Sequence, residues 1–168
     1  MDLDADILPG KSLGGLQLFG DALAALPQLE GDWVLREQPS ADGGFTFYEA
    51  DNLFMVSVDN ADLRIRCLVA HAGYTGVLYG YIRTGMTFDA LLEASPSSRR
   101  KAMHMSGGFL HLDLEESVAF GLPPHLDDLD HLSDLPGDLV LDALYVMPPA
   151  RRRVIRKNGE PAWEYLVY

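Results

Sequence analysis

Gly10-Lys11-Ser12 are the first residues of this chain whose types and spacing fit known chemistry. Counted from residue 5, they complete a phosphate-binding loop pattern, in which backbone amides and the lysine hold phosphates. Counted from residue 10, the stretch spells Gly-x-Ser-x-Gly, the turn that presents a nucleophilic serine in hydrolases. Both patterns need a strand before them and a helix after them, yet Gly14-Gly15 stands where the helix would begin. We therefore predict a turn at Pro9-Gly10 that leads into a strand over residues 16–19.

Histidines and carboxylates gather between residues 123 and 134, where His125, Asp128 and His131 offer the donor atoms of a metal site. Their spacing matches no catalytic zinc pattern. Leucines recur at every third position of the same segment, which is typical of a short packed helix or turn. We predict no metal site here.

Other potentially reactive side chains also favour structural roles. The single cysteine, Cys67, permits no internal disulfide, and the apolar residues around it predict a core position in a strand. Glu115 and Glu116 are adjacent, so in a strand they would point to opposite faces and share no acid–base cleft. The sequence therefore predicts a protein that is not an enzyme, with no catalytic residue and no cofactor.

Charge is distributed unevenly along the sequence. The chain has 25 acidic and 13 basic residues and a net charge of −12, a balance that repels nucleic acid and anionic membranes and attracts basic partners. Eight basic residues fall in two clusters, 99–101 and 151–157, while residues 102–150 contain none. Such an acidic stretch is either a solvated face or a surface that meets a basic protein. On the second interpretation, the candidate partner-binding residues are Asp113, Glu115, Glu116, Asp127, Asp128, Asp130 and Asp134.

The length of 168 residues and the hydrophobic content of 48% suit a single domain over residues 1–168 with a substantial core. No apolar run is long enough to cross a bilayer, and the acidic start lacks the basic head and apolar middle of an export signal. These features predict a cytoplasmic protein.

Hydrophobic periodicity favours strands over helices. Short segments rich in aromatic and β-branched residues are separated by turn formers, which is the spacing of an antiparallel meander. Asn158-Gly159 marks a closing hairpin, because both residues readily adopt the positive dihedral angles of a tight turn. The predicted class is α+β, mainly a curved antiparallel meander with two or three short helices. The expected strands are 32–37, 45–49, 53–58, 63–69, 76–82, 109–114, 117–122, 139–147, 152–157 and 161–168.

Two short helices are expected, over residues 21–26 and 87–93, the second with Thr87 as its capping residue. Each follows a glycine and ends near a proline. Segments 9–30 and 74–96 thus share a pattern of strand, glycine turn and short helix, which predicts a pseudo-repeat.

Three segments carry a family resemblance: residues 9–18 (PGKSLGGLQL), 80–89 (GYIRTGMTFD) and 144–148 (LYVMP). Together they resemble small acidic immunity proteins of bacterial polymorphic-toxin systems, in which the toxin is exported by type VI secretion or contact-dependent inhibition and the immunity protein stays in the cell. The resemblance implies an α+β fold without catalysis. It also implies one cognate toxin, bound so that its active site or its assembly is blocked. Interfaces diverge in such families, so the resemblance assigns no binding residue to this sequence.

Two other classes of function stay open. A small ligand-binding or enzymatic β-rich domain would gather polar groups such as His71, His104, His111 or Arg83 in a deep pocket. An effector chaperone or adaptor would bind a signal or transmembrane segment through an exposed apolar groove. Under the immunity interpretation, aromatic residues that are exposed could anchor the toxin, the candidates being Trp33, Tyr74, Tyr79, Tyr81 and Trp163.

Overall fold

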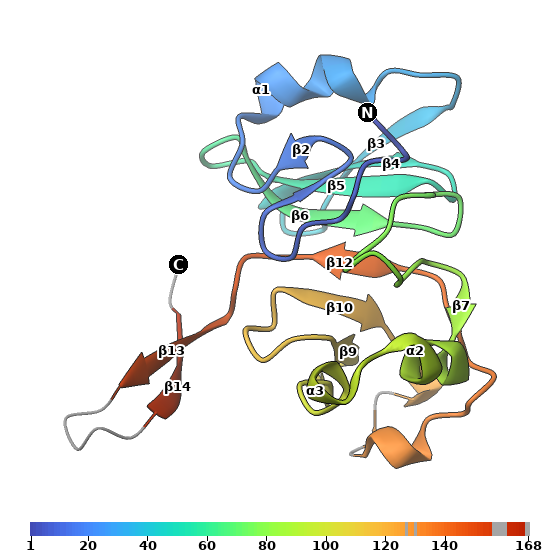
Figure 1. The fold of residues 1–168 in the computed structure, drawn as a ribbon. Coiled ribbons are helices and arrows are strands. Elements are labelled where there is room, and N and C mark those ends of the chain that lie inside the picture. Colours follow the sequence, from blue (N-terminus) through green and yellow to red (C-terminus); the bar gives the residue numbers. More distant parts are fainter. Residues whose placement is uncertain (127, 130, 156–160, 167–168) are drawn as a thin grey trace.

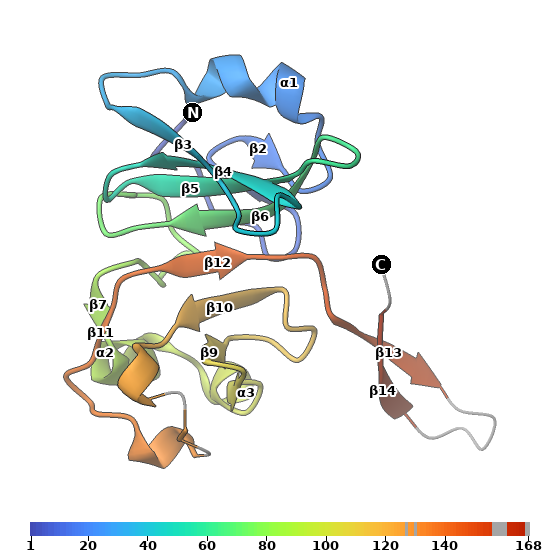
Figure 2. The ribbon, with the colours of Figure 1, turned by 180° about the vertical axis from the view of Figure 1, so that it is seen from behind.

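Eight strands of this chain pair antiparallel in one sheet (Figures 1 and 2). A computed structural model describes residues 1–126, 128–129, 131–155 and 161–166. In sheet order the strands are β3 (Leu35–Pro39), β4 (Phe45–Ala50), β5 (Phe54–Asp59), β6 (Arg64–Ala70), β12 (Leu144–Val146), β10 (Val118–Gly121), β9 (Phe109–His111) and β8 (His104–Ser106). This sheet and the few short helices confirm the predicted α+β class.

The sheet is built from two four-stranded meanders, and in each of them the strands follow one another from an edge of the sheet to its centre. β3 to β6 form the first, β8, β9, β10 and β12 form the second, and β6 pairs with β12 where they meet. Each meander follows short helices: α1 (Ala22–Ala25) and the 3-10 helix η1 (Leu26–Leu29) before the first, α2 (Phe88–Ala94) and α3 (Ser97–Arg100) before the second. The predicted cap of the second helix is confirmed, because the Thr87 hydroxyl accepts a hydrogen bond from the Ala90 amide.

Three smaller pairs complete the strands. β1 (Ser12–Leu13) and β2 (Leu16–Gln17) form a hairpin whose turn residues Gly14 and Gly15 have φ of +60° and +82°. The turn predicted at Pro9-Gly10 therefore leads into a hairpin. β7 (Met86–Thr87) pairs with β11 (Val140–Leu141), and β13 (Arg151–Ile155) pairs with β14 (Pro161–Tyr165) in the predicted closing hairpin. The predicted turn of that hairpin, Asn158-Gly159, lies outside the described residues.

The core lies between the helices and one face of the large sheet. Buried side chains of α1, η1 and α2 pack with alternate residues of the strands. The helices contribute Ala22, Ala25, Leu29, Phe88 and Leu91, and the central strands contribute Phe54, Val56, Leu68, Phe120 and Leu144. The segments predicted as a pseudo-repeat each hold a short strand before a helix: residues 9–30 contain β2 and α1, and residues 74–96 contain β7 and α2.

Two strand predictions were wrong. Residues 76–82 form a tight loop, because Tyr79 and Gly80 have φ of +55° and +79° and turn the chain so that Leu78 pairs with Ile82. Residues 139–147 form two strands, β11 and β12, which belong to different sheets. A further helical segment of the described chain, between β10 and β11, consists of the 3-10 turns η2 (Pro124–Leu126) and η3 (Leu132–Asp134).

Candidate functional site

The face of the large sheet opposite the helices carries residues that lie outside the core cluster. In Figure 2, β4, β5, β6 and β12 lie in front with no helix drawn across them. One row of directly paired residues crosses all eight strands on this uncovered face. The row consists of Arg36, Glu49, Met55, Val69, Tyr145, Ala119, His111 and His104.

The uncovered face is apolar and aromatic at its centre. Val69 and Ala119 on this face are fully buried, yet neither belongs to the core cluster. Phe109 meets Tyr145 edge to face with ring centroids 5.1 Å apart. Phe47 on β4 and Met55 on β5 are half-buried on the same face. An apolar sheet face without a covering layer is typical of a protein-binding surface.

One end of the uncovered face is hollowed. A cavity of about 310 Å³ lies among Phe19, Phe45, Asp59, Arg66 and Pro148. The Arg66 guanidinium lies over the Phe19 ring at 5.4 Å and makes ion pairs with Asp59 and Asp62. Such a hollow, with an apolar wall and a fixed charge pair, suits one side chain of a protein partner.

The acidic residues predicted to bind a partner do not gather in one place. Three of them, Asp113, Glu115 and Glu116, lie in the turn between β9 and β10. Asp128 and Asp134 belong to the segment of η2 and η3, which Figure 1 shows away from that turn. Glu115, Asp128 and Asp134 are exposed. The remaining two predicted residues, Asp127 and Asp130, lie outside the described residues.

Asp113 and Glu116 are buried and have partners within the chain. The Asp113 carboxylate accepts hydrogen bonds from the Ser117 amide and hydroxyl, at 2.9 and 2.5 Å. Glu116 has φ of +56°, forms an ion pair with Arg151 at the base of β13, and lies 3.1 Å from His104 Nε2. Both carboxylates therefore hold the β9–β10 turn and the C-terminal hairpin in place.

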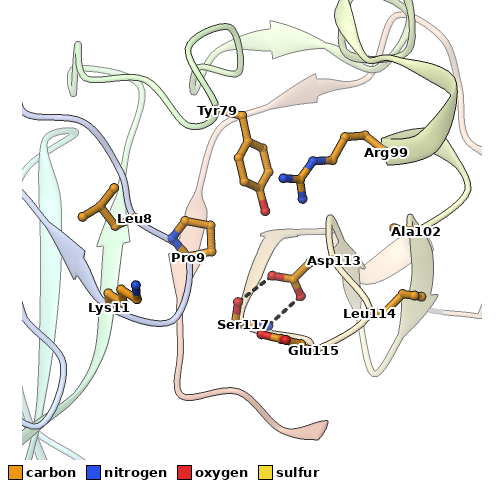
Figure 3. Close-up of a pocket in the computed structure, with 10 residues that line it drawn as sticks. All are labelled: Leu8, Pro9, Lys11, Tyr79, Arg99, Ala102, Asp113, Leu114, Glu115 and Ser117. Atoms are coloured by element: carbon orange, nitrogen blue, oxygen red, sulfur yellow. Dashed lines mark hydrogen bonds between the residues drawn. The ribbon is translucent and has the colours of Figure 1, made fainter. Parts of the chain in front are cut away.

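A pocket of about 450 Å³ opens beside that turn (Figure 3). Its walls come from the loop before β1, the loop at Tyr79, helix α3 and the β9–β10 turn. Figure 3 shows Tyr79, Arg99 and Asp113 extending toward one shared space, with Lys11 and Glu115 beside it. Burial raises the pKa of the Tyr79 hydroxyl to about 12, so this hydroxyl stays protonated and able to donate. The pocket combines charges of both signs with apolar walls, which suits a small ligand.

The histidines and Arg83 do not line this pocket. His104 and His111 stack on the uncovered face with ring centroids 5.0 Å apart, and Arg83 is exposed. Cys67 lies on that face too, half-buried rather than in the core as predicted, and burial raises the pKa of its thiol to about 12. Among the described residues, no three metal-binding side chains converge, and His125, Asp128 and His131 are all exposed.

Four of the five aromatic residues considered as anchors serve the core instead, and the side chain of the fifth, Trp163, lies outside the described part of the chain. Tyr74 is 2% exposed, and Trp33, Tyr79 and Tyr81 are partly buried against the core cluster. The residues that sequence reasoning missed are those of the uncovered face, such as Phe47, and the pocket residue Arg99. Strand alternation around Phe47 was visible in the sequence, but which face the helices would cover was not.

Comparison with known proteins gives no relative: no family model, no curated protein and no solved structure matches this chain. Within the described residues, no helix is both long and apolar enough to cross a membrane.

Proposed function

We propose that this chain is an immunity protein that binds one cognate bacterial toxin and neutralises it by occlusion, without catalysis. The observation that carries the proposal is the uncovered face of the eight-stranded sheet. Its central side chains are apolar and aromatic, no helix of the described residues covers it, and its half-buried residues lie outside the core cluster. A rigid, preformed sheet face of this kind loses little conformational entropy on binding, which favours tight complexes.

Charge supports a basic toxin as the partner. The net charge of −12 attracts a basic protein by long-range steering, and it disfavours nucleic acid and anionic membranes as partners. Of the predicted acidic contacts, Glu115, Asp128 and Asp134 are exposed, so they are the ones we propose as partner-binding residues. The proposal places the protein in the cytoplasm of the cell that makes the toxin.

The test starts with a pull-down from the native cell lysate at low and high salt, followed by identification of the captured toxin by mass spectrometry. Phe47→Ala on the uncovered face should then weaken the complex by about tenfold or more, as truncation of a central aromatic contact does. Leu23→Ala is the matched control. This substitution also removes a large apolar side chain, but Leu23 is 64% exposed on α1, away from the uncovered face. Growth protection against the expressed toxin should fall with Phe47→Ala alone.

Two outcomes would overturn the proposal. One is a captured partner whose binding is insensitive to Phe47→Ala, and the other is a captured partner that is not toxic when expressed without this chain. Charge reversal of Glu115, Asp128 and Asp134 separates the contribution of charge from that of the apolar face. Exposed charges mainly change the association rate, whereas loss of an apolar contact mainly changes the dissociation rate.

The apolar character of the same face also favours a second candidate function, an adaptor that escorts a secreted protein. An adaptor would bind a signal or transmembrane peptide in competition with its client. Under the immunity proposal, such a peptide leaves the toxin complex intact.

A further inference from the structure

The pocket beside the β9–β10 turn has an unusual balance of charge. Four charged side chains line its volume of about 450 Å³: Lys11, Arg99, Asp113 and Glu115 (Figure 3). The two cations come from the amino-terminal loop and α3, and the two carboxylates from the turn. The charges cancel locally although the whole chain carries −12.

Arg99 has no carboxylate partner among the residues that the structure describes. Its guanidinium carbon lies 3.7 Å from the centre of the Tyr79 ring, and no carboxylate oxygen of a described residue lies within 4.0 Å of its nitrogens. Arg36, Arg66 and Arg151 each have such a partner. The Tyr79 hydroxyl is a hydrogen-bond partner of Arg99, and the other N–H groups of the stacked guanidinium offer the fork geometry that binds a carboxylate through two hydrogen bonds.

Asp113 is buried and fixed in orientation at the opposite wall. The Ser117 amide donates to one carboxylate oxygen and the Ser117 hydroxyl to the other. Each oxygen keeps a second lone pair, and Figure 3 shows the carboxylate turned toward the space under Tyr79. A group made only of donors, such as an ammonium, suits these positions.

Tyr79 also lines this pocket, and its backbone is strained. Its φ of +55° lies in the left-handed region that bulky residues avoid. Strained residues of this kind persist where the surrounding structure fixes them, and they concentrate at ligand sites. Its hydroxyl adds one neutral donor beside Arg99.

We propose that this pocket binds a free α-amino acid. Arg99 and the Tyr79 hydroxyl bind the carboxylate, Asp113 binds the ammonium, and the side chain lies against Leu8, Pro9 and Leu114. A zwitterion fits better than a simple ion. A simple anion would be repelled by Asp113, Glu115 and the net negative charge of the chain, and a simple cation would be repelled by Lys11 and Arg99. The inference is independent of the toxin partner, so each can fail without the other.

The test is a thermal-shift panel of the full chain with each common α-amino acid at millimolar concentration, followed by calorimetry with the one that shifts the melting temperature most. Two analogues of that amino acid, one without the ammonium and one without the carboxylate, should each lose binding. A panel with no shift overturns the proposal, as does equal binding of either analogue.

Arg99→Gln should weaken amino-acid binding by roughly tenfold or more, because it removes a charge-assisted pair of hydrogen bonds. Arg100→Gln is the matched control with the same loss of charge, since Arg100 is exposed and one of its nitrogens bonds to the Ser97 hydroxyl. Arg99→Lys keeps the charge without the fork and should bind with intermediate affinity. Equal affinities for all three variants contradict the assignment, and their melting curves without ligand check that each is folded.

Discussion

Two neighbouring rows of side chains cross the large sheet and differ in what lies above them. The first row lies under the helices, and its members in the central strands are fully buried: Phe54, Ala70, Leu144, Phe120 and Leu110. The second row, one residue along each of these strands, has no helix above it: Met55, Val69, Tyr145, Ala119 and His111. The same strands therefore present one face for folding and another that the core leaves unused.

The rows also differ in chemistry. The covered row, from Leu35 to Met105, contains no ionisable side chain, whereas the uncovered row contains Arg36, Glu49, Tyr145, His111 and His104. Val69 of the uncovered row is nonetheless fully buried. An apolar centre with polar groups at its margin is the layout of many protein-binding surfaces.

The largest expected effect tests whether the covered row contributes more to the free energy of unfolding than the uncovered row does. Phe54→Ala should lower the free energy of unfolding by about 3–5 kcal/mol, because it leaves a cavity under the helices. Met55→Ala, at the next residue of β5, should cost only about 1 kcal/mol, since its side chain is half-buried and outside the core cluster. Urea unfolding of both full-length variants measures the difference. Equal losses would show that the two faces contribute alike.

A smaller effect is expected where the amino-terminal segment is tied to the rest of the chain. The Tyr74 hydroxyl donates to the Ala5 carbonyl at 2.5 Å and accepts from the Gly14 amide at 3.0 Å. Tyr74→Phe keeps the ring and leaves both backbone groups without this partner, so we expect a loss of about 1–3 kcal/mol. Amide exchange at Gly14 should accelerate in the variant. An unchanged exchange rate would mean that the hydroxyl does not hold this segment.

Dependence on pH should belong to the uncovered row. Burial first, and then the neighbouring His104, lower the pKa of His111 below its ordinary value of 6.5. The unfolded chain therefore binds more protons than the folded chain once the pH falls below about 6.5. Stability should decrease as the pH falls through the pKa of the folded state, with a slope from this group no steeper than about 1.4 kcal/mol per pH unit.

His111→Gln removes this titration. The difference in unfolding free energy between the parent and His111→Gln, measured from pH 8 to pH 5, should shift in favour of the variant as the pH falls. His71 also has a pKa lowered chiefly by burial, so the variant keeps part of the pH dependence. A constant difference across the range would contradict the role assigned to His111.

Much of the fold was predictable because its signals are local. Alternation in residues 45–49, 53–58 and 63–69 predicted β4, β5 and β6, and the capping threonine predicted the start of α2. The position of β12 between β6 and β10 was not predictable, because it joins residues about 75 positions apart in sequence. The strand predicted over residues 76–82 was wrong for a related reason. The loop depends on the positive φ of Tyr79, which hydrophobic periodicity does not reveal.

The candidate sites were harder to predict than the fold. Glu115 and Glu116 are adjacent and chemically alike, yet the turn exposes the first and buries the second against Arg151. Charge counting alone cannot distinguish them, because the turn geometry decides which carboxylate meets solvent. The stacked pair of Tyr79 and Arg99 comes from a loop and a helix that the sequence did not connect.

The smallest expected effect tests whether the second face is truly uncovered. A Cβ added at Gly121 of β10 would lie 2.9 Å from Cε2 of the Tyr145 ring, which must move. Because no layer packs over that ring, it can tilt outward, and Gly121→Ala should change the unfolding free energy by less than about 1 kcal/mol. Gly76→Ala is the contrasting control, since its added Cβ would overlap the Ala5 carbonyl oxygen, which is backbone and cannot swing aside. A loss at Gly121 as large as that at Gly76 would mean that Tyr145 is held from above.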